Sequence, residues 1–227
     1  MKFWNGHDFK GRISKLATEP NKLQCGAVLI SNHSILTAAH CLQNTGLVAL
    51  TGSGSHNQAS YEIPASKQIK HPNYSSVYLT NDIAVLNVSK RINYNSSVYP
   101  AIMPIKTPVN KAPSTVCGWG TISYPGIEYP EDLNCADNFI LDNTNCRSYY
   151  GSEIRAGMVC AMSNSFEEDA CTGDSGGPFF DWFSYDDSSY EAVTEEVVGL
   201  VSWGRGCGTQ PGIASKLKMI SLRINIK

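Results

Sequence analysis

The chain has 227 residues, of which 42% are hydrophobic and 17% charged, and its formal net charge at pH 7 is −2. This length can bury a sizeable core in one large domain or two small ones. Because 18 Lys and Arg stand against 20 Asp and Glu, the chain has no electrostatic reason to bind nucleic acid or an anionic membrane surface. We therefore expect neither as a partner.

Eight cysteines indicate the cellular compartment. They do not fall in paired C-x-x-C spacing, which favours four disulfides in an oxidising, extracellular location over a zinc site. Four N-x-[ST] sequons begin at Asn32, Asn73, Asn87 and Asn95 and are consistent with secretion. The first residues contain no apolar segment that could act as a signal peptide, so we expect Met1 to be an artificial or misassigned start.

Short apolar runs rich in β-branched residues and separated by Gly, Pro, Asn and Ser predict an all-β chain. In chain order these runs are residues 25–30, 83–88, 115–119, 158–162 and 197–203. No apolar stripe at helical spacing extends over three turns, which favours an antiparallel barrel or sandwich over a parallel α/β architecture. Four prolines between Arg91 and Ser114 predict a connection between two strand-rich halves, with a boundary near Tyr99.

The segment 181–196 contains six acidic residues and no Lys or Arg. Such a run of like charge favours solvent, so we expect a long, exposed hairpin loop here. A docking surface for a basic partner is the alternative.

Three short motifs carry groups suited to nucleophilic catalysis. Ser175 lies in the glycine-rich sequence Gly-Asp-Ser-Gly-Gly-Pro, where backbone N–H groups can converge on one point beside the hydroxyl. His40 follows three small residues and precedes a cysteine, and Asp82 directly precedes an apolar strand. Each motif alone is more often structural, as a turn serine, a surface histidine or a strand cap.

Together, in the order His, Asp, Ser, these motifs resemble the chymotrypsin/trypsin family of serine proteases. The resemblance extends from about Cys25 to Lys216. It implies a single peptidase domain of two antiparallel six-stranded β-barrels, at about residues 12–98 and 99–227, with the active site in the cleft between them.

The resemblance also assigns catalytic roles. It makes Ser175 the nucleophile, His40 the general base and then acid, and Asp82 the carboxylate that orients the imidazole. The backbone N–H groups of Gly173 and Ser175 would form the oxyanion hole.

A carboxylate six residues before the serine, Asp169, matches the floor of the family's primary specificity pocket and would suit Lys or Arg. Asp169 could also simply extend the acidic run 167–169. Further positions match the substrate-binding strand, the glycine walls and an aromatic lining of that pocket: Ser202, Trp203, Gly204, Gly212 and Tyr150.

The resemblance suggests how the cysteines pair. It implies bonds between Cys25 and Cys41, between Cys146 and Cys160, and between Cys171 and Cys207 at the rims of the pocket. The family partner of Cys117 is absent, because Asp181 stands at its position, so we expect a cross-strand bond between Cys117 and Cys135.

Both ends of the chain depart from the family. Family members are activated when cleavage frees an apolar N-terminus that pairs with the residue before the active serine. Here that pair would be Phe3, freed by a cut after Lys2, and Asp174. The segment after Ala214 is too short for the family's closing helix. Residues 51–61 contain no carboxylate, so the calcium-binding loop of some trypsins has no counterpart here, and we expect no metal and no cofactor.

These observations predict a secreted, monomeric endopeptidase that cleaves proteins or peptides after Lys or Arg, and that protein inhibitors could block. The alternative is a catalytically silent homologue with a binding or regulatory role. A preference for aromatic residues is disfavoured by Asp169.

Overall fold

The computed structural model describes residues 12–18, 23–42, 46–55, 58–125, 128–164, 168–187 and 190–217, with only the backbone described at 182–187 and 190–194. The strands are β1 (Ile13–Ala17), β2 (Leu23–Ser31), β3 (Ser34–Thr37), β4 (Val48–Thr51), β5 (Tyr61–Lys70), β6 (Ala84–Val88), β7 (Pro113–Gly118), β8 (Asn134–Leu141), β9 (Met158–Met162), β10 (Pro178–Asp187), β11 (Tyr190–Trp203) and β12 (Gly212–Lys216). The helices are η1 (Ala39–Cys41), α1 (Asn143–Tyr150) and η2 (Gly151–Glu153).

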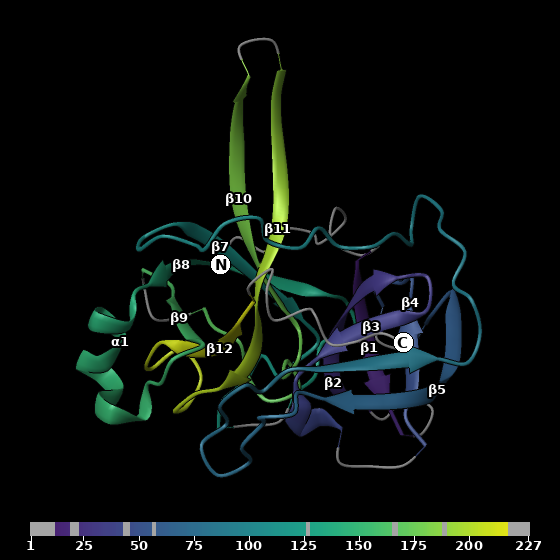
Figure 1. Cartoon of the computed structure of the whole chain (residues 1–227), viewed down its shortest axis with the longest axis horizontal. Coiled ribbons are helices and arrows are strands. Elements are labelled where there is room, and N and C mark those ends of the chain that lie inside the picture. The colour runs from purple at the N-terminus through teal and green to yellow at the C-terminus, as the bar shows by residue number, and fades with distance from the viewer. Residues whose placement is uncertain are drawn as a thin grey trace.

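The strands close into two antiparallel barrels of six strands each, which confirms the expected all-β architecture. The first barrel has the order β1-β2-β3-β6-β5-β4, and the second repeats this pattern as β7-β8-β9-β12-β11-β10. Figure 1 shows the barrels side by side, the first in purple and blue and the second in green and yellow. Closure pairs the edge strands that an open sheet would expose.

Central strands of the first barrel are buried on both faces, which explains their unbroken apolar sequence. Ala27 and Leu29 pack inside the first barrel. Val28, between them, belongs to a second cluster that includes Trp119 and Phe180 of the other barrel. Because the two barrels share this apolar interface, loops from both meet in a fixed arrangement.

The acidic segment forms paired strands in place of the expected loop. β10 and β11 pair from Pro178 opposite Leu200 out to Asp187 opposite Tyr190, and they project from the second barrel as a two-stranded ribbon (Figure 1). At its base, Asp181 and Glu196 lie opposite each other and are only 1% and 4% exposed. The prediction of a hairpin is right, but a fully solvated loop is wrong because strand pairing continues through its base.

Four disulfides are present, with the pairings that the sequence led us to expect: Cys25–Cys41, Cys117–Cys135, Cys146–Cys160 and Cys171–Cys207. Cys117 and Cys135 lie directly opposite each other on β7 and β8, so their bond crosses a strand pair.

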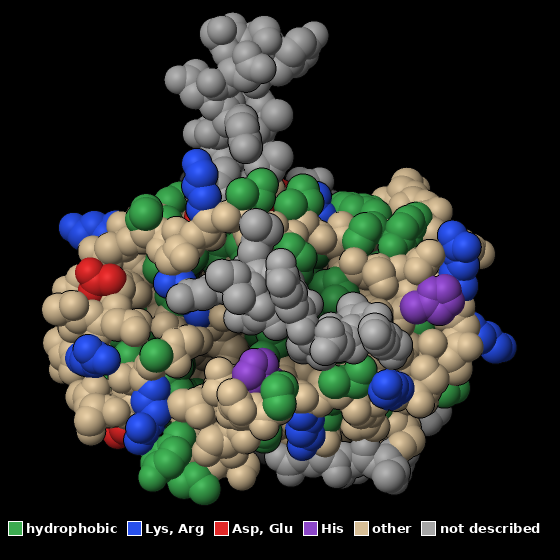
Figure 2. Space-filling model, viewed as in Figure 1, with side chains coloured by type: hydrophobic (Ala, Val, Ile, Leu, Met, Phe, Trp, Pro, Cys, Tyr) green, Lys and Arg blue, Asp and Glu red, His purple; other side chains and the backbone are tan. Residues whose placement is uncertain are grey.

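Charged side chains are dispersed over the face that Figure 2 shows. On the face shown in Figure 2, Lys and Arg side chains lie in separate positions around the rim, without a single large basic patch. In the part of the chain that the structure describes, no helix is both long and apolar enough to cross a membrane.

Helix α1 was not predicted from the sequence. Asp142 caps its first turn by accepting the N–H of Asn145 at 2.7 Å, and the helix ends at Gly151. The helix has about two turns, and only Cys146 and Tyr150 in it are buried. Its sequence therefore lacks the apolar stripe over three turns that would have predicted a helix. The signal available in the sequence was the run of Asp and Asn followed by Gly.

Candidate active site between the barrels

Strand register brings His40 and Asp82 together. β3 ends at Thr37, which pairs with Ala84 at the start of β6. His40 lies three residues after Thr37 in η1, and Asp82 lies two residues before Ala84, so both fall beyond the same end of one strand pair. The His40 Nδ1 atom is 2.7 Å from Asp82 Oδ2.

Asp82 is fully buried, and three donors surround its carboxylate. In addition to the His40 ring, the backbone N–H of His40 donates to Oδ1 at 2.9 Å, and the Ser202 hydroxyl donates to Oδ2 at 2.5 Å. Ser202 is itself 5% exposed and comes from β11 of the second barrel. A buried carboxylate held in this way fixes the imidazole with Nδ1 toward Asp82 and leaves Nε2 available to the cleft.

The Ser175 loop is tied to both barrels. The N–H of Gly26 on β2 donates to Ser175 O at 2.8 Å, and the N–H of Gly176 donates to Val201 O at 2.7 Å. Cys41, the neighbour of His40, is disulfide-bonded to Cys25 on the same strand β2. Ser175 is therefore held on the strand that also anchors the histidine segment.

Gly173 adopts a backbone conformation that only glycine accepts readily, with φ +104°. A Cβ atom there would lie 3.1 Å from Gly120 Cα. Among the described residues, the N–H groups of Gly173 and Ser175 donate to no acceptor. Two free donors beside a serine hydroxyl are the arrangement that a developing oxyanion requires.

A pocket of about 300 Å³ is lined by Ser175 and Asp169 together. It also includes Ser202, Trp203, Gly204 and Gly212, so most of the residues predicted to bind substrate share one cavity. Asp169 accepts the N–H of Ala170 at 2.8 Å and that of Gly208 at 3.2 Å. Burial raises the pKa of Asp169 to about 6, because these bonds offset the loss of solvent only in part.

The pocket wall depends on Gly212. A Cβ atom at this position would lie 2.7 Å from Asp169 Oδ1 and would obstruct the carboxylate. Tyr150 is not among the residues that line the pocket; it packs behind the wall, donates to Pro211 O at 2.6 Å and meets the Trp203 ring edge to face. It supports the wall and does not touch the cavity.

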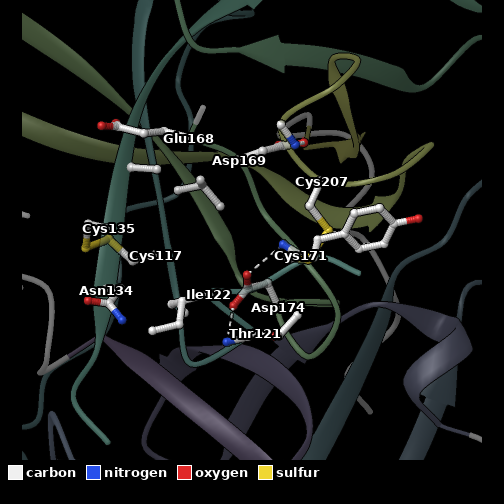
Figure 3. Close-up of a pocket in the computed structure, with 16 residues that line it drawn as sticks. Cys117, Thr121, Ile122, Asn134, Cys135, Glu168, Asp169, Cys171, Asp174 and Cys207 are labelled. Carbon is white, nitrogen blue, oxygen red and sulfur yellow. Dashed lines mark hydrogen bonds between the residues drawn. A yellow bond between two sulfur atoms is a disulfide. The ribbon is translucent and has the colours of Figure 1, made fainter. Parts of the chain in front are cut away.

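Asp174 borders a second cavity, of about 410 Å³ (Figure 3). Asp174 is 8% exposed, and its carboxylate accepts the N–H groups of Gly120 at 2.7 Å and Cys171 at 2.9 Å. Burial raises the pKa of Asp174 to about 6. Figure 3 shows the Cys117–Cys135 disulfide on one side of this cavity and Asp174 between Thr121 and Cys171. Phe3, its predicted partner, lies outside the described residues.

One residue that lines both cavities was missed in the sequence. Tyr124 is 59% exposed and borders the Ser175 pocket as well as the Asp174 cavity. The available signal was an aromatic residue in a segment rich in Pro and Gly. In the described residues, Cys25, His40 and Cys41 are the one group close enough to share a metal, but both sulfurs belong to their disulfide.

Comparisons with known proteins agree with this geometry. A family model described as Trypsin matches residues 6–224. The chain is 35% identical over 200 residues to trypsin-3 of Salmo salar, covering 85% of this chain and 78% of that protein. It is 31% identical over 208 residues to kallikrein-7 of Homo sapiens, covering 90% and 78%.

Among solved structures, neuropsin, a serine protease expressed in the limbic system of mouse brain, matches with a TM-score of 0.83 and 29% identity. This match covers 95% of this chain and 93% of that one. The chain therefore belongs to the trypsin family of serine proteases.

Proposed function

We propose that the chain is a secreted serine endopeptidase that cleaves peptide bonds after Lys or Arg. One observation carries the proposal: a single pocket of about 300 Å³ is lined by both Ser175 and the carboxylate of Asp169. A nucleophile and a buried anion in one cavity suit a substrate that places a cationic side chain beside its scissile bond.

In the proposed reaction, Ser175 Oγ attacks the substrate carbonyl while His40 Nε2 accepts the hydroxyl proton. The carbonyl oxygen becomes an oxyanion and is bound by the N–H groups of Gly173 and Ser175. When the C–N bond breaks, His40 returns its proton to the leaving amine. Water then attacks the acyl-enzyme by the same route and restores the serine. Asp82 stabilises the imidazolium throughout.

Asp169 would provide the specificity for Lys or Arg. Its carboxylate is ionised at neutral pH, because even the raised pKa of about 6 lies below 7. A cationic side chain entering the pocket would restore the charge compensation that burial removes. A neutral aromatic side chain would leave the carboxylate uncompensated, which disfavours it.

Activation would place a new ammonium group against Asp174. A cut after Lys2 would free Phe3, and the cavity of about 410 Å³ beside Asp174 lies within the range of pockets that hold small organic groups. Burial of the carboxylate supports this proposal, since a buried anion gains most from a paired cation.

The remaining proposals concern the surroundings of the enzyme. Four disulfides support an extracellular location. Substrates would be proteins or peptides with accessible Lys or Arg, protein inhibitors could occupy the same cleft, and the protein would act as a monomer.

The experiment compares the parent with Ser175→Ala and Asp169→Ser on Arg and Phe amide substrates, before and after a cut at Lys2. We expect Ser175→Ala to remove turnover without unfolding the protein, and Asp169→Ser to remove the preference for Arg. Full activity in Ser175→Ala would refute the nucleophile. Absence of activity in every form of the parent would favour the silent homologue.

A further inference from the structure

We propose that the protein carries N-linked glycans on Asn73 and Asn95, and none on Asn32 or Asn87. The proposal rests on secretion, because the modifying enzymes act on exported chains. All four asparagines satisfy the N-x-[ST] sequon, so the motif alone does not distinguish them. The structure does, because a bulky hydrophilic glycan can be carried only at the surface of the folded protein.

Asn95 lies at the tip of an exposed turn. Its N–H donates to Val98 O at 2.9 Å, and the N–H of Val98 donates back to Asn95 O at 3.2 Å. Asn95, Ser96 and Ser97 are all exposed. Asn95 Oδ1 accepts the N–H of Ser97 at 2.8 Å, which turns the carboxamide toward the residue whose hydroxyl the sequon requires. Within the described residues, Asn95 Nδ2 has no hydrogen-bond partner.

Asn73 is also exposed, in the turn that follows β5. Its backbone is held at both ends: the N–H donates to His71 Nδ1 at 3.1 Å, and the carbonyl accepts Asn81 Nδ2 at 2.9 Å. Its own carboxamide makes no hydrogen bond to any described residue. Among the described residues, the acceptor nitrogen is therefore unpaired, on a turn whose backbone is hydrogen-bonded at both ends.

Asn87 is the penultimate residue of β6 and pairs with Ser34 of β3 on one side and Lys67 of β5 on the other. Its Oδ1 atom accepts the Ser34 hydroxyl at 3.1 Å. This bond holds the half-buried Asn87 carboxamide against Ser34, so a bulky glycan on Nδ2 would crowd the neighbouring strands. Asn32 is partly buried beside His33, and the hydroxyl residue of its sequon is Ser34, which is only 4% exposed.

The covalent step would be transfer from a lipid-linked oligosaccharide diphosphate. The asparagine Nδ2 atom forms a bond with the anomeric carbon of the first sugar, and the bond from that carbon to the phosphate oxygen breaks. The carboxamide loses one proton to a base of the transferring enzyme, and the lipid diphosphate leaves with the electron pair. No oxidant or reductant is needed.

The glycan on Asn73 has a further consequence for the proposed protease. The backbone carbonyl of Asn73 accepts a hydrogen bond from Asn81 Nδ2, and Asn81 directly precedes Asp82. The same loop places Val77, Tyr78 and Leu79 around a hollow of about 260 Å³ that Trp203 also lines. Because Trp203 also lines the Ser175 pocket, a sugar on this loop would stand near that pocket and would hinder large protein substrates more than short peptides.

Occupancy is tested on the chain secreted from a glycosylating eukaryotic cell behind a cleavable leader. A glycoamidase, which hydrolyses the amide bond between the glycan and Asn and so converts each carrier Asn to Asp, followed by peptide mass mapping, should show conversion at Asn73 and Asn95 alone. Ser97→Ala should remove the glycan on Asn95 as Asn95→Gln does, whereas Ser97→Thr should retain it. Conversion at Asn87 or Asn32, or none at all, would overturn the proposal. Mass mapping measures the occupancy of each Asn whether or not the protein is active. An inactive protein would therefore count against the proposed function but not against the proposed glycans.

The effect on substrates is tested with Asn73→Gln, and Asn95→Gln serves as the matched control. Asn73→Gln should cleave a folded protein substrate severalfold faster than the glycosylated parent and a short Arg amide at the same rate. Asn95→Gln should change neither rate. Equal rates on the protein substrate in both variants would refute the shielding by the Asn73 glycan.

Discussion

Titration of Asp169 should control the selectivity of the enzyme. Burial raises the pKa of this carboxyl to about 6, so the pocket loses its negative charge as the pH falls through 6. A neutral pocket no longer favours a cationic side chain. The test therefore changes the pH from 8 to 5 and compares the cleavage of a substrate that contains Arg with that of one that contains citrulline, the uncharged isostere of Arg.

The size of the effect follows from the pKa. At pH 5, one unit below the pKa, only about one-tenth of the Asp169 carboxyl is ionised, so the selectivity for Arg over citrulline should fall about tenfold relative to pH 8. Because kcat/KM reports ionisations of the free enzyme, a bound cation does not obscure the transition. Ionisations that affect both substrates equally cancel in the ratio.

The assay measures kcat/KM for matched Arg and citrulline peptide amides at half-unit steps of pH. Asp169→Asn serves as the control, because its carboxamide keeps the shape of the pocket and cannot ionise. Its ratio should be low and independent of pH. A parent ratio that stays constant from pH 8 to 5 would refute the assignment of Asp169 as the specificity residue.

Three further predictions concern other buried groups. Ser202→Ala removes one of three donors to Asp82, so kcat should fall about tenfold or more in steady-state assays, since a hydrogen bond to a charged group contributes about 1.5–3 kcal/mol. Burial raises the pKa of Asp174 from 3.8 to about 6, so between pH 4 and 7 the uncut parent should lose about 2.4 kcal/mol more stability than Asp174→Asn, because the carboxyl ionises at lower pH in the unfolded chain. Urea unfolding of both proteins at both pH values checks this difference. Burial lowers the pKa of Lys15 to about 8, so the stability of the parent relative to Lys15→Met should rise by about 2 kcal/mol between pH 7.5 and 9.5. If the stability difference between the two proteins does not change with pH, the burial of this charge is contradicted.

Much of the fold could be predicted because its signals are local. The short apolar runs with Gly and Pro between them indicated antiparallel strands, and the three catalytic motifs placed the chain in a family with two barrels. The pairing of Cys117 with Cys135 was predicted from the absence of a cysteine at Asp181, and register confirms it.

Other features depend on tertiary packing, which no local pattern reports. The sequence predicted Asp181 and Glu196 to be part of a solvated acidic run, but both are buried at the base of the paired strands. Tyr150 matched a pocket residue, but its ring lies behind the wall because its hydroxyl bonds to Pro211. Lys15 had no signal at all: it is 2% exposed, bonded to Ser55 O at 2.6 Å, and packed on Trp119.

The most direct test of the central claim is covalent labelling of the serine. The parent and His40→Ala are each cut after Lys2 and treated with a serine-directed fluorophosphonate, and the adduct is located by peptide mass. The account predicts a stoichiometric adduct on Ser175 in the parent and little in His40→Ala, because the hydroxyl needs the imidazole as base. An adduct elsewhere, or equal labelling of Ser175 in both proteins, would contradict the proposed catalytic site.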